Sequence, residues 1–358
     1  MRAASVFVGR GVDETSRLLP ALFSICGTAQ SAACAGALEQ ALRIRPGPGV
    51  ANLRRRLVDA ETLREHLWRI LLDWPRTLDE SPHTPSMARV MALFGTLRTA
   101  LAGGGEPFAP GAGGAQPDLE SADLALAGLA DLVAERVFGA PPAEWLASVR
   151  GFDALAGWSR RAGTAAGRLV GWLVAAGYMD LGRSDVGPLP PLGAAALELR
   201  LDGTAGDDFV ARPDWAGEPC ETSPYTRVLG SALVRDLSAR CGNGLLTRLA
   251  AALVEVAGLA AGGGHPEPAA EDGLTAGVGL AQVPAARGLL VHRVRVVDGL
   301  VRDYRILAPT EWNFHPKGVV AAGLASLSTR AEPCDFESLA RLYITAVDPC
   351  VEFTLQLN

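Results

Sequence analysis

Apolar residues recur at helical spacing in the first quarter of the chain. Three leucines fall on one side of residues 12–22, which predicts an amphipathic helix. The stretch 29–42 consists mainly of small residues and predicts a second helix that can pack closely against a neighbour. A third helix is expected over 59–74, with Asp59 as its N-cap and Pro75 as its end.

The middle of the chain is also mainly helical in pattern, with one break. The stretch 102–117 is rich in Gly and Pro, which predicts a flexible insertion. Short strands are expected at 197–201 and 208–211. Helical patterns occupy three stretches beyond the break, the last of which holds two helices: 119–138, 142–177 and 224–261.

The C-terminal part of the sequence changes character. β-branched and alternating residues at 289–297 and 302–308 predict two strands. The dipeptide Asp298-Gly299 between them favours a tight hairpin turn. A final helix is expected over 336–348. The fold class predicted from these patterns is α+β, a mainly helical body with small β-hairpin elements.

Composition narrows the class of protein. Of the 358 residues, 49% are hydrophobic and 20% are charged, so the chain can bury a large core. The formal net charge of -6 disfavours nucleic acid as a partner, because the overall field repels phosphate. No stretch is apolar enough to predict a membrane span. The N-terminal sequence lacks a secretory signal, so a cytoplasmic location with reduced thiols is expected.

Six cysteines are the candidate ligands, at positions 26, 34, 220, 241, 334 and 350. None belongs to a C-x-x-C pair, so an ordinary structural zinc site is not predicted. Taken singly, each would more often be a buried, inert thiol. The sequences around Cys26 and Cys350 set these two apart.

Four segments accompany these two cysteines. The first, 9–33, reads GRGVDETSRLLPALFSICGTAQSAA, and the second, 217–227, reads GEPCETSPYTR. The third, 286–316, reads ARGLLVHRVRVVDGLVRDYRILAPTEWNFHP. The fourth is the C-terminal sequence VDPCVEFTLQLN.

Together these segments resemble the large subunit of nickel-iron hydrogenases, and in particular its relatives of the hydrogenase expression/formation protein HupK (HoxV) family. The first segment is similar to R-x-C-G-x-C-x-x-x-H, the second weakly to G-x-P-x-E-x-x-P-x-x-R, and the fourth to D-P-C-x-x-C-x-x-H. The third resembles P-R-G-x-L-x-H followed by P-T-x-W-N-x-x-P, and its matching residues are Arg287, Gly288, Leu290, His292, Gly299, Tyr304, Pro309, Thr310, Trp312, Asn313 and Pro316. The resemblance implies one large-subunit-like domain over 1–358, although the middle, about 54–201, has no clear match.

The departures from the family pattern exclude hydrogen turnover. Hydrogenases hold nickel with four thiolates from two cysteine pairs, and two of these thiolates bridge to an iron that carries cyanide and carbon monoxide. Here Ala29 and Phe353 stand at the second position of each pair, and Ala33 and Gln356 replace the histidines. The resemblance therefore implies no nickel and no enzyme activity, because two thiolates cannot form the four-sulfur site.

The retained residues imply a carrier of iron. The resemblance makes Cys26 and Cys350 the metal ligands of a transiently bound Fe(CN)2(CO) unit, where the N- and C-terminal segments meet at a buried site. It places Arg287 and Thr310 against the cyanides and Leu290 beside carbon monoxide. The implied function is a scaffold that passes this unit to the hydrogenase large-subunit precursor. The implied partners are that precursor, a small HypC-type chaperone and a HypD-type iron-sulfur protein.

Two other functions stay open at this point. One is a metal-free chaperone that mimics the large subunit and protects a hydrogenase subunit or a maturation partner. The other is an electron-transfer subunit like the hydrogenase-derived subunit of respiratory complex I. The survival of both first-position cysteines argues against each. Among the remaining thiols Cys34 is expected nearest the site, and His292 is expected to be a hydrogen-bonded core histidine rather than a ligand.

Overall fold

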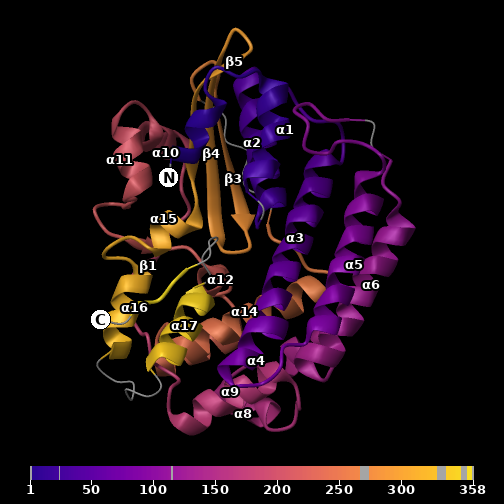
Figure 1. Cartoon of the computed structure of the whole chain (residues 1–358), viewed down its shortest axis with the longest axis vertical. Coiled ribbons are helices and arrows are strands. Elements are labelled where there is room, and N and C mark those ends of the chain that lie inside the picture. Colours follow the sequence, from indigo (N-terminus) through magenta and orange to yellow (C-terminus); the bar gives the residue numbers. More distant parts are fainter. Residues whose placement is uncertain are drawn as a thin grey trace.

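Helices make up most of the fold, and a small antiparallel sheet stands at one end of them (Figure 1). The computed structural model describes residues 2–23, 25–113, 116–266, 274–328, 336–347 and 353–356. The α+β class predicted from the sequence is confirmed. No helix in the described part of the chain is both long enough and apolar enough to cross a membrane.

The first helices form where their apolar patterns predict them. A short 3-10 turn, Arg2–Phe7, precedes α1 (Val12–Leu22) and α2 (Gly27–Leu42). The small residues of α2 let it lie close to the sheet. A Cβ added at Gly279 of the sheet would come within 1.8 Å of the carbonyl oxygen of Ala37 in α2, so this position requires glycine.

The third helix is longer than expected, and the predicted N-cap is wrong. α3 (Val50–Trp68) continues through a π-helical turn into α4 (Trp74–Thr77). Asp59 lies buried in the middle of α3, where its carboxylate pairs with the imidazole Nδ1 of His265 at 2.5 Å. Pro75 stands in the first turn of α4 instead of ending the helix. The carbonyl of Leu71, four residues earlier, accepts from the His83 N–H at 2.9 Å in place of the N–H that proline lacks.

The Gly- and Pro-rich stretch connects two long helices that pack together. These are α5 (Thr84–Ala102), which the sequence did not suggest, and α6 (Leu119–Val133). The described part of the connection contacts α3, because Arg54 Nε donates to the carbonyl of Pro107 at 2.6 Å. A π-helical turn continues α6, and three helices follow: α7 (Pro142–Ser148), α8 (Phe152–Ser159) and α9 (Ala165–Ala176).

The two short strands expected next are helices. They are α10 (Ala194–Leu201) and α11 (Ala205–Ala211). Leu197 and Leu201 are both buried and lie four residues apart, so the same apolar pair fits one face of a helix as well as one face of a strand. The pattern was too short to distinguish the two periods.

Three helices, not two, occupy the next stretch. They follow a two-stranded parallel sheet of β1 (Gly187–Pro188) and β2 (Cys220–Glu221). The longest of them runs through the main core, where Arg248 and Glu221 form a fully buried ion pair. In order the helices are α12 (Pro224–Arg227), α13 (Ala232–Cys241) and α14 (Leu245–Ala260).

The predicted hairpin is present as two strands of a three-stranded antiparallel sheet, order β3-β4-β5. Asp298 and Gly299 form its turn with φ values of 53° and 73°, as the dipeptide predicts. The third strand was not expected. The strands are β3 (Val278–Ala285), β4 (Gly288–Val297) and β5 (Leu300–Leu307).

Among the described residues, three helices follow the sheet, and the last of these three is the predicted one. They are α15 (Pro309–Asn313), α16 (Val319–Ser328) and α17 (Phe336–Val347). In Figure 1, α16 and α17 lie together below the sheet, on the opposite side of the molecule from α5 and α6.

Candidate functional site

The second and third sequence segments meet at the backbone of Thr222. The side-chain amide of Asn313 accepts from the Thr222 N–H at 2.9 Å and donates to its carbonyl at 2.6 Å. Leu289 N–H donates to the Thr222 hydroxyl at 2.8 Å. Gly288 has a φ of +135°, and a Cβ there would come within 2.5 Å of the Thr222 carbonyl oxygen. The matched glycine and asparagine therefore hold the start of β4 against the β2 region.

Arg227 fixes the turn that precedes Arg287. Its guanidinium donates to the carbonyls of Ala285 and Ala286 at 2.9 and 2.8 Å. The same guanidinium binds both carboxylate oxygens of Glu255, which is buried in α14. The Arg227 charge opposes the desolvation of Glu255, and the pKa of this carboxyl lies well below its usual range. The second sequence segment, 217–227, is the weakest of the four matches, and its Arg227 thus positions the hairpin.

The first segment meets the hairpin through apolar contacts. Leu290 is 1% exposed and belongs to one buried cluster with Ala29, Ala33 and Ala285. Ala29 and Ala33 stand where the family pattern has a cysteine and a histidine, and both are fully buried. The described structure therefore has tightly packed methyl groups at these two positions.

Cys26 occupies the N-cap position of α2 and is 6% exposed. The amide Nε2 of Gln30, one turn along α2, lies 3.7 Å from its sulfur as a donor. The first backbone N–H groups of α2 are used by Glu61 instead, which accepts from Thr28 and Ala29 at 2.9 Å each. Burial raises the pKa of Glu61 despite these hydrogen bonds.

Arg287 is connected to the residue before Cys26. The guanidinium is 2% exposed and donates to a carboxylate oxygen of Glu65 at 2.8 Å. Glu65 also pairs with Arg64, whose guanidinium donates to the carbonyl of Ile25 at 3.0 Å. This sequence of contacts holds a buried cation close to the N-terminal cysteine segment.

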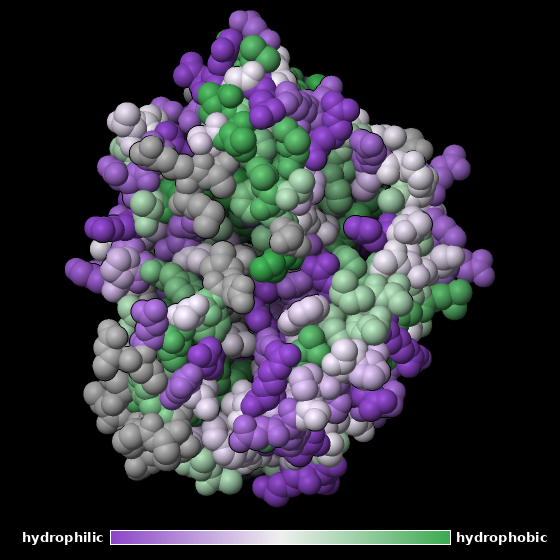
Figure 2. All heavy atoms as spheres, viewed as in Figure 1, coloured by the Kyte–Doolittle hydropathy of each residue, from purple (hydrophilic) through white to green (hydrophobic). Residues whose placement is uncertain are grey.

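Three distant parts of the chain line one cleft of about 800 Å³. Ile25 comes from the first segment, Arg287 from the hairpin, and Thr345 and Phe353 from the C-terminal region. Hydrophilic atoms gather near the middle of this face in Figure 2, between the positions of α3 and α17 in Figure 1. Residues close in sequence to the two cysteines thus line one cleft. Of the predicted site residues that the structure describes, Arg287 belongs to this lining, and Cys26, Leu290 and Thr310 do not.

The cleft is more basic than the protein as a whole. Its lining contains five arginines and two carboxylates, those of Glu65 and Asp73, which leaves an excess of three positive charges. The chain as a whole has a net charge of -6. A basic cleft favours anionic ligands. The five arginines of the lining are Arg64, Arg69, Arg76, Arg287 and Arg341.

The remaining predicted site residues are placed as follows. Thr310 is half-buried in the first turn of α15, and the described lining of the cleft does not include it. Cys350 lies outside the described residues, as does Cys334, so the pairing of Cys26 with Cys350 stays a prediction. Within the described part of the chain, no three His, Cys, Asp or Glu side chains are arranged to hold a metal ion.

His292 is a hydrogen-bonded core residue, as expected. It is fully buried, and its ring nitrogens bond the Tyr304 hydroxyl at 2.9 Å and the Gln30 side-chain oxygen at 2.8 Å. Burial lowers the pKa of His292 to about 3, so the imidazole is neutral.

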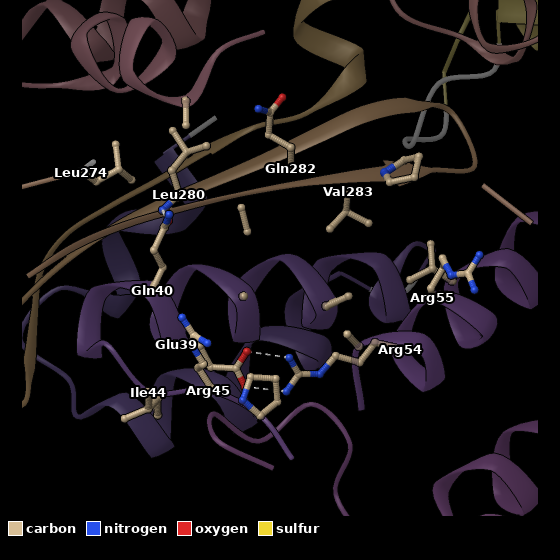
Figure 3. A pocket seen from close by; sticks show the side chains of 18 of the residues that line it. Glu39, Gln40, Ile44, Arg45, Arg54, Arg55, Leu274, Leu280, Gln282 and Val283 are labelled. Carbon is tan, nitrogen blue, oxygen red and sulfur yellow. Dashed lines mark hydrogen bonds and ion pairs between the residues drawn. The ribbon is translucent and has the colours of Figure 1, made fainter. Parts of the chain in front are cut away.

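A second cavity, of about 900 Å³, lies between α2, α3 and β3 (Figure 3). Its polar side chains hold these elements together. Arg54 of α3 forms a two-pronged ion pair with Glu39 of α2, both bonds being 2.8 Å. Gln40 reaches the sheet and accepts from the Leu280 N–H at 2.5 Å. Of the predicted site residues that the structure describes, none lines this cavity. The observed contacts show that its polar side chains join α2, α3 and the sheet.

Sequence reasoning missed Gln30, Glu61, Arg64 and Glu65. Each contacts the segment around Cys26 or Arg287. Glu61, Arg64 and Glu65 lie on α3 and are three or four residues apart, so they share one face of this helix. This spacing was the only feature of the sequence that could have indicated them.

Comparison of the fold defines the class of protein. The structure is similar to the Ni-Fe-Se hydrogenase from D. vulgaris Hildenborough, with a TM-score of 0.61 over 97% of this chain and 90% of that chain, at 15% identity. It is also similar to the [NiFeSe]-hydrogenase of Dm. baculatum, with a TM-score of 0.54 over 98% of this chain and 91% of that one, at 15% identity. The chain therefore has the fold of a hydrogenase large subunit.

Sequence relatives identify the family within that class. Hydrogenase expression/formation protein HoxV of Cupriavidus necator is 33% identical, over 97% of this chain and 88% of that protein. Proteins named HupK from Rhizobium leguminosarum bv. viciae and Azotobacter vinelandii are 32% and 30% identical, over 99% and 98% of this chain and 89% and 90% of theirs. No model of a protein family matches the sequence. The chain belongs to the HupK/HoxV family of hydrogenase expression/formation proteins.

Proposed function

We propose that this protein is a non-catalytic scaffold of nickel-iron hydrogenase maturation, which holds the Fe(CN)2(CO) unit and passes it to the hydrogenase large subunit. The observation that supports this most is the arginine-rich cleft, where Ile25, Arg287 and Phe353 come together from three distant segments. Family membership supports a maturation role.

The proposed iron ligands are the thiolates of Cys26 and Cys350. Thiolates are soft donors that suit a low-spin iron which already has three diatomic ligands. Alanine at position 29 and phenylalanine at position 353 provide no further sulfur, so no nickel site can form beside the iron. A cargo bound by two protein ligands is also released more easily than one bound by four.

The proposed cyanide partners are Arg287 and Thr310. The guanidinium of Arg287 is held by Glu65, which reduces the entropy lost when it bonds an anionic cyanide nitrogen. Thr310 would supply a hydroxyl donor, and Leu290 would provide the apolar wall beside carbon monoxide. The buried packing of Leu290 against Ala29 and Ala33 fits that apolar role.

The proposed partners follow from this function. A small HypC-type chaperone and a HypD-type iron-sulfur protein would deliver the iron unit, and the large-subunit precursor would receive it. Exchange among these proteins would take place in the cytoplasm.

Infrared spectroscopy tests the proposal directly. The protein is purified without oxygen from a host that has the maturation machinery, and its iron content is measured in parallel. We expect two cyanide bands and one carbon monoxide band, with about one iron per chain. A protein that supports hydrogenase maturation but contains no iron and shows no bands would contradict the scaffold function and favour a metal-free chaperone.

Cysteine variants identify the ligands. Cys26→Ala and Cys350→Ala should each abolish the bands, because a single remaining thiolate leaves an attachment that solvent displaces. Cys34→Ala is the matched control and should keep them, since burial raises the pKa of the Cys34 thiol to about 11 and disfavours the thiolate. Thermal unfolding should show that all three variants fold. Bands of wild-type intensity in both the Cys26 and the Cys350 variant would rule out the two-thiolate site.

A further inference from the structure

Four polar side chains lie buried in the apolar contact between α2 and the sheet. Gln30 and Cys34 come from α2, His292 from β4 and Tyr304 from β5. Each is 4% exposed or less. Burying a polar group costs free energy unless the group is hydrogen-bonded, so these four side chains need partners within the contact.

The four side chains bond one another in a line that ends at Cys26. The Tyr304 hydroxyl lies 2.9 Å from His292 Nδ1, and His292 Nε2 lies 2.8 Å from the Gln30 side-chain oxygen. The Gln30 amide nitrogen lies 3.7 Å from the Cys26 sulfur. At the far end, Cys34 forms a hydrogen bond with the Tyr304 hydroxyl.

The side-chain oxygen of Gln30 fixes the direction of this line. A carbonyl oxygen only accepts, so Nε2 of the neutral His292 has to be its protonated nitrogen. His292 Nδ1 then accepts from the Tyr304 hydroxyl. At the far end, the Cys34 thiol shares a hydrogen bond with the Tyr304 hydroxyl, and burial raises its pKa to about 11. From Tyr304 to Gln30, every donor in the line points toward Cys26.

We propose that Tyr304 and His292 orient the Gln30 amide so that its N–H donates to the Cys26 sulfur, and that Gln30 is thereby a positioning residue for the thiolate that holds iron. For its effect on bound iron this inference rests on the proposed function. A hydrogen bond to a ligating sulfur withdraws electron density from it and tunes the metal. The Gln30 amide is already oriented before any cargo arrives, because its oxygen is held by His292.

The orientation can be tested on iron-free protein. Nitrogen NMR of the 15N-labelled wild type distinguishes the two neutral tautomers of His292, and assignment uses His292→Gln. We expect a proton on Nε2 and none on Nδ1. The opposite tautomer would require the Gln30 amide group to face the imidazole and its oxygen to face Cys26, which would overturn the inference. This outcome does not depend on whether the protein carries iron.

The effect on cargo is tested with Gln30→Met, which keeps the side-chain length and removes the N–H donor. With the donor gone, the sulfur of Cys26 donates more strongly to iron, and the carbon monoxide and cyanide bands should move to lower wavenumber. Gln40→Met is the matched control, because it removes a glutamine of the same helix that bonds Leu280 and not Cys26. Its bands should stay at the wild-type positions even if its stability falls.

The outcomes separate the inference from the proposed function. Unchanged bands in Gln30→Met, or equal shifts in both variants, would contradict the positioning role. A wild type without any bands would contradict the scaffold function, and the His292 tautomer would then still support or overturn the orientation of Gln30. If Gln30→Met fails to fold, the wild-type tautomer decides in the same way.

Discussion

Burial sets the chemical state of single residues around the proposed site. It raises the pKa of the Cys220 and Cys241 thiols, as it does for Cys34. Because metals bind thiolates, these cysteines are poor ligands in the folded protein. The expectation that they are inert thiols is consistent with this chemistry. Burial lowers the pKa of His292 instead, because the charged form of a histidine is the protonated one.

His292 should make folding stability depend on pH. Its folded pKa of about 3 lies below that of an exposed histidine, about 6.5, so the unfolded chain binds the proton more tightly. The contribution of His292 to the free energy of unfolding is therefore full above pH 6.5. It is lost as the pH falls toward 3, by about 1.4 kcal/mol per pH unit well below 6.5. Urea unfolding at pH 7 and pH 5 measures it.

A His292→Gln variant provides the reference for this measurement. It removes the titrating group, so its free energy of unfolding should fall less between pH 7 and pH 5 than that of the wild type. Other titrating groups contribute equally to both proteins and cancel in the difference. Equal losses in the two proteins would mean that folding does not lower the pKa of His292.

Contacts between elements depend on a few small residues. α2 crosses the sheet so closely that Gly279 of β3 has no room for a side chain against Ala37. This contact brings α2, with Cys26 at its start, against the strand that precedes Arg287. The distance between helix and sheet therefore also sets the distance between Gln30 and His292.

Gly279→Ala should push α2 away from the sheet. We expect a loss of about 1–3 kcal/mol in the free energy of unfolding, because the added methyl would overlap the Ala37 carbonyl. Gly95→Ala is the control: Gly95 lies inside α5 with nothing within 4 Å of an added Cβ, so this variant should be stabilised by up to about 1 kcal/mol. Chemical unfolding compares the two. A stable Gly279→Ala protein would show that the contact is not tight.

At the scale of the whole molecule, the chain has the fold of a hydrogenase large subunit without two of its expected thiols. We expect the purified protein to contain no stoichiometric nickel and to show no hydrogen uptake or evolution. The physical reason is that Ala29 is fully buried and Phe353 lines the cleft, so neither position offers a sulfur to bridge two metals. Metal analysis and a hydrogen assay check this, and one nickel per chain would contradict it.

Strong local patterns allowed several elements to be predicted from the sequence. α1, α2 and the β4–β5 hairpin formed where expected, because their apolar spacing and the Asp298-Gly299 turn act over a few residues. β3 was missed, since its glycine, alanines and proline resemble a loop and its pairing with β4 is what makes it a strand. Asp59 resembled a helix cap, but it pairs with His265, 206 positions away.

The sequence by itself determined the α+β class, the family resemblance and the loss of two cysteines, because these depend on local spacing and residue identity. Only the tertiary structure decided which polar groups meet. Gln30 bonds His292 across 262 positions, and Arg287 bonds Glu65 across 222. Such contacts follow from how α2, α3 and the sheet pack on one another, and no local pattern encodes that packing.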